Sequence, residues 1–179
     1  DVARAHSADQ AGDNSVVTET DKPCVFPYIR HEGLTGGLHV GDRIVVAGIP
    51  YMRVGENIAA FTIGKNFTYR YAVSGGAVDC PKLPEATPAP EGETQEEAYV
   101  RVQADVNILR SLIAKVPYVT WINKEWMGAD EIAKGIVDGW ISSPGHYKNM
   151  IDPKFNEGGV GIAMVNDYLI ATHVLVQAP

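Results

Sequence analysis

The segment Gly139–Met150 constrains the fold most, because it joins the end of one helix to the start of another. Apolar residues recur at helical spacing before it, after a start at Gly128–Asp130, so we expect this helix to bury one face. Pro144 disfavours helical geometry in the residue before it, and Gly145 permits a bend. The sequence therefore predicts that His146 is held at a rigid corner. The apolar positions are Ile132, Ile136, Val137 and Trp140.

Three polar residues are candidates for chemistry, and each has a structural alternative. His146 can be a metal ligand, an acid-base group or a hydrogen-bonded strut, and the corner alone favours the strut. His31 precedes a glycine-rich turn, which suits a ring aimed into a cleft or an exposed loop histidine. Glu56 is flanked by apolar residues and needs partners if it is enclosed. It either accepts backbone hydrogen bonds or carries a proton and orients a ligand.

Length and composition limit the possible classes of protein. A chain of 179 residues supports one well-buried core, so we expect a single domain with an insertion. The net charge of -7, without a cluster of basic residues, argues against binding to nucleic acid. No apolar run approaches the roughly 20 residues of a membrane helix.

The N-terminal residues 2–11 have the pattern of the later turns of a helix, and no capping residue precedes them. We therefore expect that an upstream segment was removed.

The first half of the chain predicts a helix, two extended segments and a linker. Val40–Gly48 fits a short helix that ends at glycine, although its β-branched run could equally be a strand. Tyr51–Ala59 predicts a strand, and Phe61–Cys80 a strand or hairpin that turns at Gly75–Gly76. The proline-rich, acidic residues 81–97 predict an extended linker.

The second half predicts a helix and a hairpin. Val102–Ile113 has helical spacing, and we expect that helix to end before Pro117. The segment Trp121–Trp126 is interpreted as a compact connection. Val160–Val165 and Tyr168–Val176 are apolar runs separated by two turn-forming residues, which predicts an antiparallel pair of strands.

Two cysteines, Cys24 and Cys80, lie beside prolines in loop-like segments. Their separation is unlike the close pairs that bind zinc or carry out redox chemistry. We expect one structural disulfide between them, and hence an oxidising compartment. The alternative is two unrelated buried thiols.

Three short motifs together resemble those of a known family. In chain order they are Gly55–Ala59, Gly139–His146 and Gly159–Ala163. Their combination is similar to the bacterial and archaeal branch of the CAP superfamily, the SCP domains of cysteine-rich secretory proteins, insect-venom antigen 5 and plant pathogenesis-related proteins. The resemblance implies an α+β fold, a three-layer α-β-α sandwich with a central antiparallel sheet, over residues 1–179 and with an insertion at about 61–127.

The resemblance also implies a ligand cleft. The family lines its cleft with two histidines and two acidic residues, and by position these are similar to His31, His146 and Glu56. The second acid has no counterpart, because Ser143 stands in its place. With Asn57 beside Glu56, the expected cleft comprises these five residues.

Several functions are compatible with this cleft. If His31 and His146 meet, they suit zinc or another divalent cation; the alternative is a solvated cleft without metal. The favoured interpretation is a secreted or cell-envelope domain, not an enzyme, that binds a small molecule, a lipid or a cell-surface ligand. One alternative is a hydrolase that uses the same cleft. It would have to be metal-assisted, with water activated by the ion, because Ser142 and Ser143 lack the strained turn of a serine nucleophile. A structural or adhesive module is the other.

Overall fold

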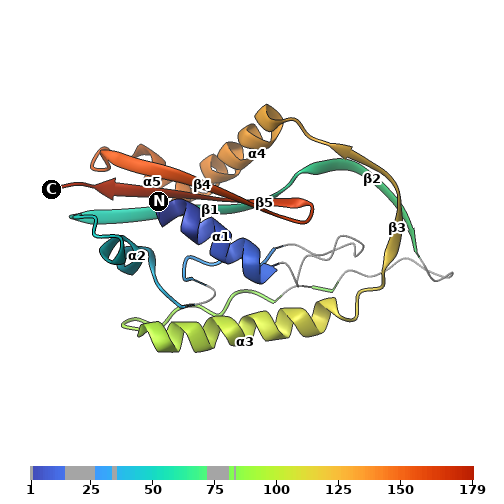
Figure 1. Ribbon diagram of the computed structural model, residues 1–179, viewed down its shortest axis with the longest axis horizontal. Helices are drawn as coiled ribbons and strands as arrows, with labels where there is room; N and C mark the ends of the chain where they lie inside the picture. Colours follow the sequence, from blue (N-terminus) through green and yellow to red (C-terminus); the bar gives the residue numbers. More distant parts are fainter. Residues whose placement is uncertain (1, 15–26, 34–35, 72–80, 83) are drawn as a thin grey trace.

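The computed structural model describes residues 2–14, 27–33, 36–71, 81–82 and 84–179 (Figure 1). Cys24, Cys80 and the expected turn at Gly75–Gly76 lie outside these residues, so the disulfide stays a prediction. None of the described helices is long and apolar enough to cross a membrane. The helices are α1 (Val2–Asn14), α2 (Val40–Val46), α3 (Gln95–Ile113), α4 (Ala129–Ser142) and α5 (Pro144–Ile151). The strands are β1 (Arg53–Thr62), β2 (Gly64–Tyr71), β3 (Val119–Trp126), β4 (Glu157–Val165) and β5 (Tyr168–Gln177).

The main sheet has three antiparallel strands in the order β1-β5-β4, so β1 is an edge strand. β4 and β5 form the expected hairpin. Their pairing runs without a break from Glu157 opposite Val176 to Val165 opposite Tyr168. At the turn, Asn166 has a φ of 51°, a left-handed conformation that asparagine tolerates better than most residues. The hairpin prediction is therefore confirmed.

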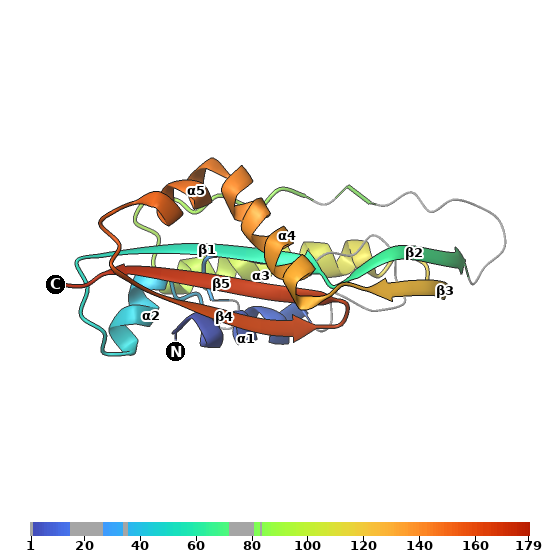
Figure 2. The same ribbon diagram turned by 90° about the horizontal axis from the view of Figure 1, so that it is seen from above.

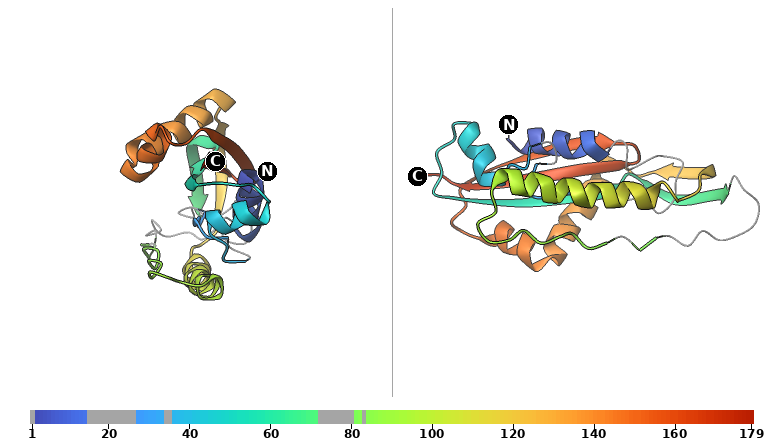
Figure 3. Two further views of the ribbon diagram at one scale, coloured as in Figure 1. Left: turned by 90° about the vertical axis from the view of Figure 1, so that its left-hand side faces the viewer. Right: turned by 90° about the horizontal axis from the view of Figure 1, so that it is seen from below.

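Helices cover both faces of this sheet, with α1 and α2 on one side and α4 and α5 on the other (Figures 2 and 3). The strands alternate their side chains between these two layers. On β5, Val174 and Val176 pack with Ile44 of α2, whereas Ala171 packs with Ile136 of α4. The mixed α+β class and its α-β-α layering are confirmed.

α1 lies directly on β4. A Cβ atom added to Gly161 would lie 2.2 Å from the carbonyl carbon of Ala3, which leaves no room for a side chain. The hydroxyl of Ser7 donates to the Gly161 carbonyl at 3.0 Å, and its lone pairs are left to accept from the Thr172 hydroxyl at 2.9 Å. The glycine thus permits the close approach of helix and sheet, and the serine fixes its position.

The expected insertion contains a second sheet and a long helix. β2 and β3 pair antiparallel and extend beyond the main sheet, and α3 lies past the β1 edge (Figures 1 and 3). The helix prediction for Val102–Ile113 is confirmed, but α3 begins earlier, at Gln95, behind a capping box of Thr94 and Glu97. The interpretation of Trp121–Trp126 as a compact connection is wrong, because these residues belong to β3 and pair with β2.

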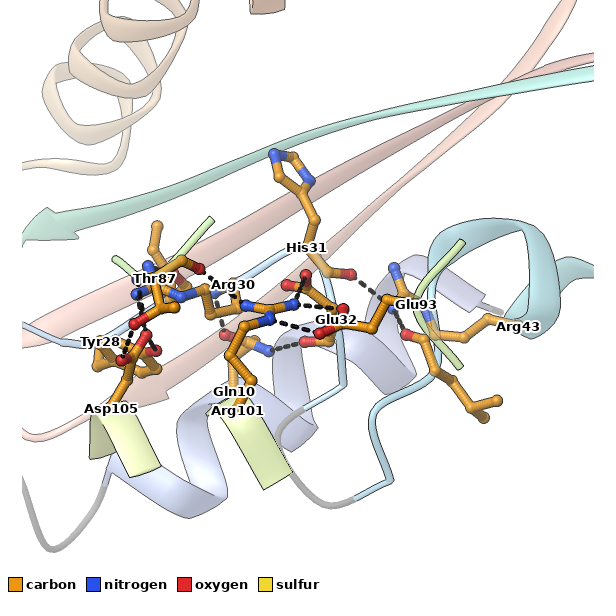
Figure 4. Close-up of polar contacts among 12 residues, drawn as sticks. Gln10, Tyr28, Arg30, His31, Glu32, Arg43, Thr87, Glu93, Arg101 and Asp105 are labelled. Carbon is orange, nitrogen blue, oxygen red and sulfur yellow. Dashed lines mark hydrogen bonds and ion pairs between the residues drawn. The ribbon is translucent and has the colours of Figure 1, made fainter. Parts of the chain in front are cut away.

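A buried carboxylate holds α3 against the segment that follows α1 (Figure 4). Asp105 accepts hydrogen bonds from Tyr28 at 3.0 Å, from Arg30 at 3.1 Å and from the Thr87 hydroxyl at 2.6 Å. Burial acts to raise the pKa of Asp105, but these donors outweigh it and hold the pKa below its usual range. The apolar contact beneath is a cluster of Tyr28, Val102, Val106, Leu109 and Ile113.

The corner between α4 and α5 forms as predicted. Ser143 ends α4 and precedes α5 in an extended conformation (φ -93°, ψ 115°), and Pro144 begins α5. Trp140, in the last turn of α4, is 5% exposed and lies 5.8 Å from the His173 ring. Its indole nitrogen has no hydrogen-bond partner among the described residues. Trp140 thus anchors the corner by packing.

We predict that Trp140→Ala lowers the free energy of unfolding by about 3–5 kcal/mol, because it removes buried contacts and leaves a cavity. Trp140→Phe is the matched variant. This variant keeps an aromatic ring and removes an N–H group that lacks a partner, so it should lower the free energy of unfolding by less than Trp140→Ala does. Denaturant unfolding of the three proteins measures both values. Equal losses for the two variants would show that the indole nitrogen, and not packing, anchors the corner.

We also predict that Asp105→Ala loosens α3, because it leaves the Arg30, Tyr28 and Thr87 donors unpaired, at a cost of about 2–4 kcal/mol. Hydrogen exchange of the α3 amides measures the effect. Exposed Glu96→Ala, on the same helix, is the control and should leave exchange unchanged. Unaltered protection of α3 in Asp105→Ala would contradict the assigned role.

Candidate functional site

A buried carboxylate lies at the centre of the candidate site. Glu56, on β1, is 5% exposed and accepts hydrogen bonds from Arg43 of α2 and from Nδ1 of His31, the latter at 3.0 Å. His6 of α1 has its Nε2 atom 3.8 Å away. Burial acts to raise the pKa of Glu56, but the His31 hydrogen bond and the charge of Arg43 outweigh it, so the pKa lies below its usual range. Glu56 is therefore ionised near neutral pH.

Arg43 connects this carboxylate to the loop that carries His31. Its guanidinium also donates to the carbonyl oxygens of His31 at 2.9 Å and of Leu38 at 2.6 Å (Figure 4). One side chain thus fixes the strand, the start of α2 and the preceding loop relative to one another. Arg43 and His6 are not predicted from the sequence, because nothing in the spacing of α1 or α2 marks a residue that will face Glu56.

The next residue of β1 supports the site from the other face of the sheet. Asn57 is fully buried, donates to the carbonyl oxygen of His146 at 3.2 Å and accepts from Asn149 of α5 at 3.0 Å. Asn149 also donates to the Glu56 carbonyl at 3.2 Å. Asn57 is therefore a positioning residue for α5, and its amide holds His146 through the backbone.

The two histidines meet at the free edge of β1. The ring centroids of His31 and His146 are 6.1 Å apart, at an interplanar angle of 62°. The His31 side chain is 52% exposed, so the pair is open to solvent on one side. Burial lowers the pKa of His146, and the neighbouring His31 lowers it further. The His146 ring is thus neutral near pH 7, the form that binds metals.

The 6.1 Å between the two ring centroids is close to the separation of two imidazoles on one metal ion. Zinc–nitrogen bonds of about 2.0–2.1 Å place the ion about 3 Å from a ring centroid, so two rings on one ion have centroids roughly 5–6 Å apart. Because ionised Glu56 can only accept, Nδ1 of His31 carries the hydrogen, and in the neutral form of the ring Nε2 then keeps its lone pair. His31 and His146 would hold the ion, and Glu56 would orient His31.

The serines at the corner have other roles. The Ser142 hydroxyl donates to the Asp138 carbonyl at 2.8 Å, within α4. Ser143 is partly buried between the helices, and its carbonyl accepts from the Tyr147 N–H at 2.8 Å. The structure places Ser143 on the same corner as His146.

A second group of possible metal ligands lies between the His31 loop and α3. Donor atoms of Glu32, His39 and Glu93 all lie within 4.8 Å of one another. Arg101 of α3 already pairs with Glu32 at 2.6 Å and with Glu93 at 2.7 Å (Figure 4). Since one guanidinium pairs with both carboxylates, the group is an ion-pair network that connects α3 to the loop.

Comparison with known proteins supports the resemblance seen in the motifs. The family described as "CAP: Cysteine-rich secretory protein family" matches residues 109–177. The match spans the end of α3, β3, the α4–α5 corner with His146, and the β4–β5 hairpin. No curated protein and no solved structure matches the chain. Residues 109–177 are thus similar to the CAP family, and this supports the CAP superfamily that the motifs resemble.

Proposed function

We propose that this CAP domain acts outside the cell and binds a divalent cation, zinc by preference, through His31 and His146. The cation and the two rings form the polar end of a binding cleft for a small ligand. One observation carries the proposal: the His31 ring is oriented by a buried, ionised carboxylate, with the His146 ring 6.1 Å away.

The carboxylate is better suited to orient a ligand than to be one. Both oxygens of Glu56 are already used, one by Arg43 and the other by His31. A carboxylate that accepts from a ligating imidazole fixes its tautomer and raises its basicity. Two protein nitrogens leave open positions on zinc, which water or a ligand would fill. The open side of the His31 ring gives a small molecule access to them.

The alternatives rest on fewer observations. A metal-assisted hydrolase would use the same residues, with water activated by the ion. The hydroxyl of Ser142 donates to the Asp138 carbonyl within its own helix and makes no hydrogen bond to an imidazole of the described residues, so a serine nucleophile there has no base beside it. Binding therefore stands as the function that the geometry supports best.

We predict that the protein binds one zinc ion near neutral pH, and that His31→Ala and His146→Ala each abolish binding while the fold persists. Glu56→Gln should weaken binding by about 10–100-fold, because the orienting carboxylate is lost. His39→Ala is the matched control, since His39 lies in the Glu32–Glu93 group. Calorimetric titration with zinc measures all four variants. Loss of binding in His39→Ala alone would place the ion in that other group.

The pH dependence follows from the imidazoles. Protons compete with zinc, so binding weakens as pH falls through the histidine range, near 6–7. Because the pKa of His146 is lowered, this ring remains neutral to lower pH than an ordinary histidine. Zinc titrations between pH 5 and 8 measure the decline. Affinity that is independent of pH over this range would contradict ligation by the two rings.

A further inference from the structure

The residues on either side of His31 both pair with α3. The carboxylate of Glu32 accepts from Arg101 at 2.6 Å, and the guanidinium of Arg30 donates to Asp105 at 3.1 Å (Figure 4). Arg101 and Asp105 are four residues apart, so they lie on one face of the helix. The His31 ring points away from α3 (Figure 4) and bonds to the buried carboxylate on β1. The expected insertion therefore contacts the chain immediately before and after a proposed metal ligand.

The charges of these two pairs fix the position of α3 along the segment that carries His31. Arg30 and Glu32 have opposite charges, and so have their partners on the helix. A shift of α3 by one turn, in either direction, would bring two residues of like charge together. Only one placement of the helix satisfies both pairs, so the contact is specific.

The helices on the other side of this segment hold its backbone. The Gln10 side chain of α1 accepts from the Arg30 N–H at 2.8 Å and donates to the Glu32 carbonyl at 3.1 Å. Arg43 of α2 donates to the His31 carbonyl at 2.9 Å. None of these three bonds satisfies the carboxylate of Glu32, a residue that is only 6% exposed. That charge is left to α3.

Arg101 is well placed to hold this carboxylate. Its side chain is 10% exposed, and its guanidinium also binds Glu93 at 2.7 Å and the Thr87 carbonyl at 3.0 Å. The guanidinium is thus fixed by three partners, and its planar fork is already oriented when it meets Glu32.

Removal of Arg101 would leave the Glu32 carboxylate buried without its arginine partner. A buried charge that loses its partner moves toward water, because its desolvation is no longer offset. His31 is the adjacent residue, so its backbone would move with Glu32 and its ring would lose the 3.0 Å hydrogen bond to Glu56. The orientation of a ligating ring is one determinant of metal affinity.

We propose that Arg101 is a positioning residue for the histidine pair: by pairing with Glu32 it holds His31 in the orientation that binds zinc. The helix α3 thereby sets the affinity of the site. This role rests on the proposed function where it concerns zinc, but the position of the His31 ring is measurable without zinc.

The test uses Arg101→Met, which keeps a long side chain and removes the charge. In the zinc-free parent, nitrogen-15 NMR should detect the hydrogen on Nδ1 of His31, because the bond to Glu56 slows its exchange with water. We expect this signal to be lost in Arg101→Met, and calorimetry to show zinc binding that is about 10-fold weaker. An unchanged signal in the variant would overturn the proposal, as would its absence from the parent. A parent that shows the signal but binds no zinc would contradict the proposed function and not the positioning of His31.

Two further proteins separate positioning from a general loss of stability. The double variant Glu32→Gln/Arg101→Met removes the buried charge together with its partner, so the His31 signal should return. A signal that stays lost would show that Arg101 does not act through Glu32. Leu109→Ala removes buried contacts of α3 but neither ion pair, so it should lower the unfolding midpoint and leave the signal and zinc affinity unchanged. Equal loss of the signal in Leu109→Ala would assign the effect to stability and overturn the proposal.

Discussion

The buried carboxylate of Glu56 is the interaction on which the candidate site depends. An ionised carboxylate at 5% exposure persists only with charged or hydrogen-bonding partners. Arg43 and His31 supply them from α2 and from the loop before it. To satisfy one charge, the chain must therefore bring a helix, a loop and a strand to the same point.

The edge position of β1 explains how two layers contribute to one site. Alternation along the strand directs Glu56 toward α1 and α2, and Asn57 toward α5. Because none of the described strands pairs with the outer side of β1, His31 can reach Glu56 from the loop, and His146 can approach from α5. The unpaired edge is thus where the two histidines meet.

Local signals predicted part of this structure well. The proline after Ser143 and the two turn residues before Tyr168 are enough to indicate the α4–α5 corner and the β4–β5 hairpin. Local context marks His31, Glu56 and His146 as candidates and the resemblance places them in one cleft, but no local pattern shows that they meet. The pairing of β2 with β3 joins segments far apart in sequence, which is why Trp121–Trp126 was misinterpreted. Arg43, His6 and Arg101 likewise act only through tertiary contacts.

The tautomer of His31 tests the central claim most directly. The account requires ionised Glu56 to hold the hydrogen on Nδ1, so that Nε2 presents a lone pair beside the His146 ring. Nitrogen-15 NMR of the imidazoles at neutral pH, with the His31 signals assigned from the His31→Ala variant, measures which ring nitrogen carries the hydrogen. The account predicts that Nδ1 of His31 carries hydrogen and that Nε2 does not. A ring with its hydrogen on Nε2 would contradict it.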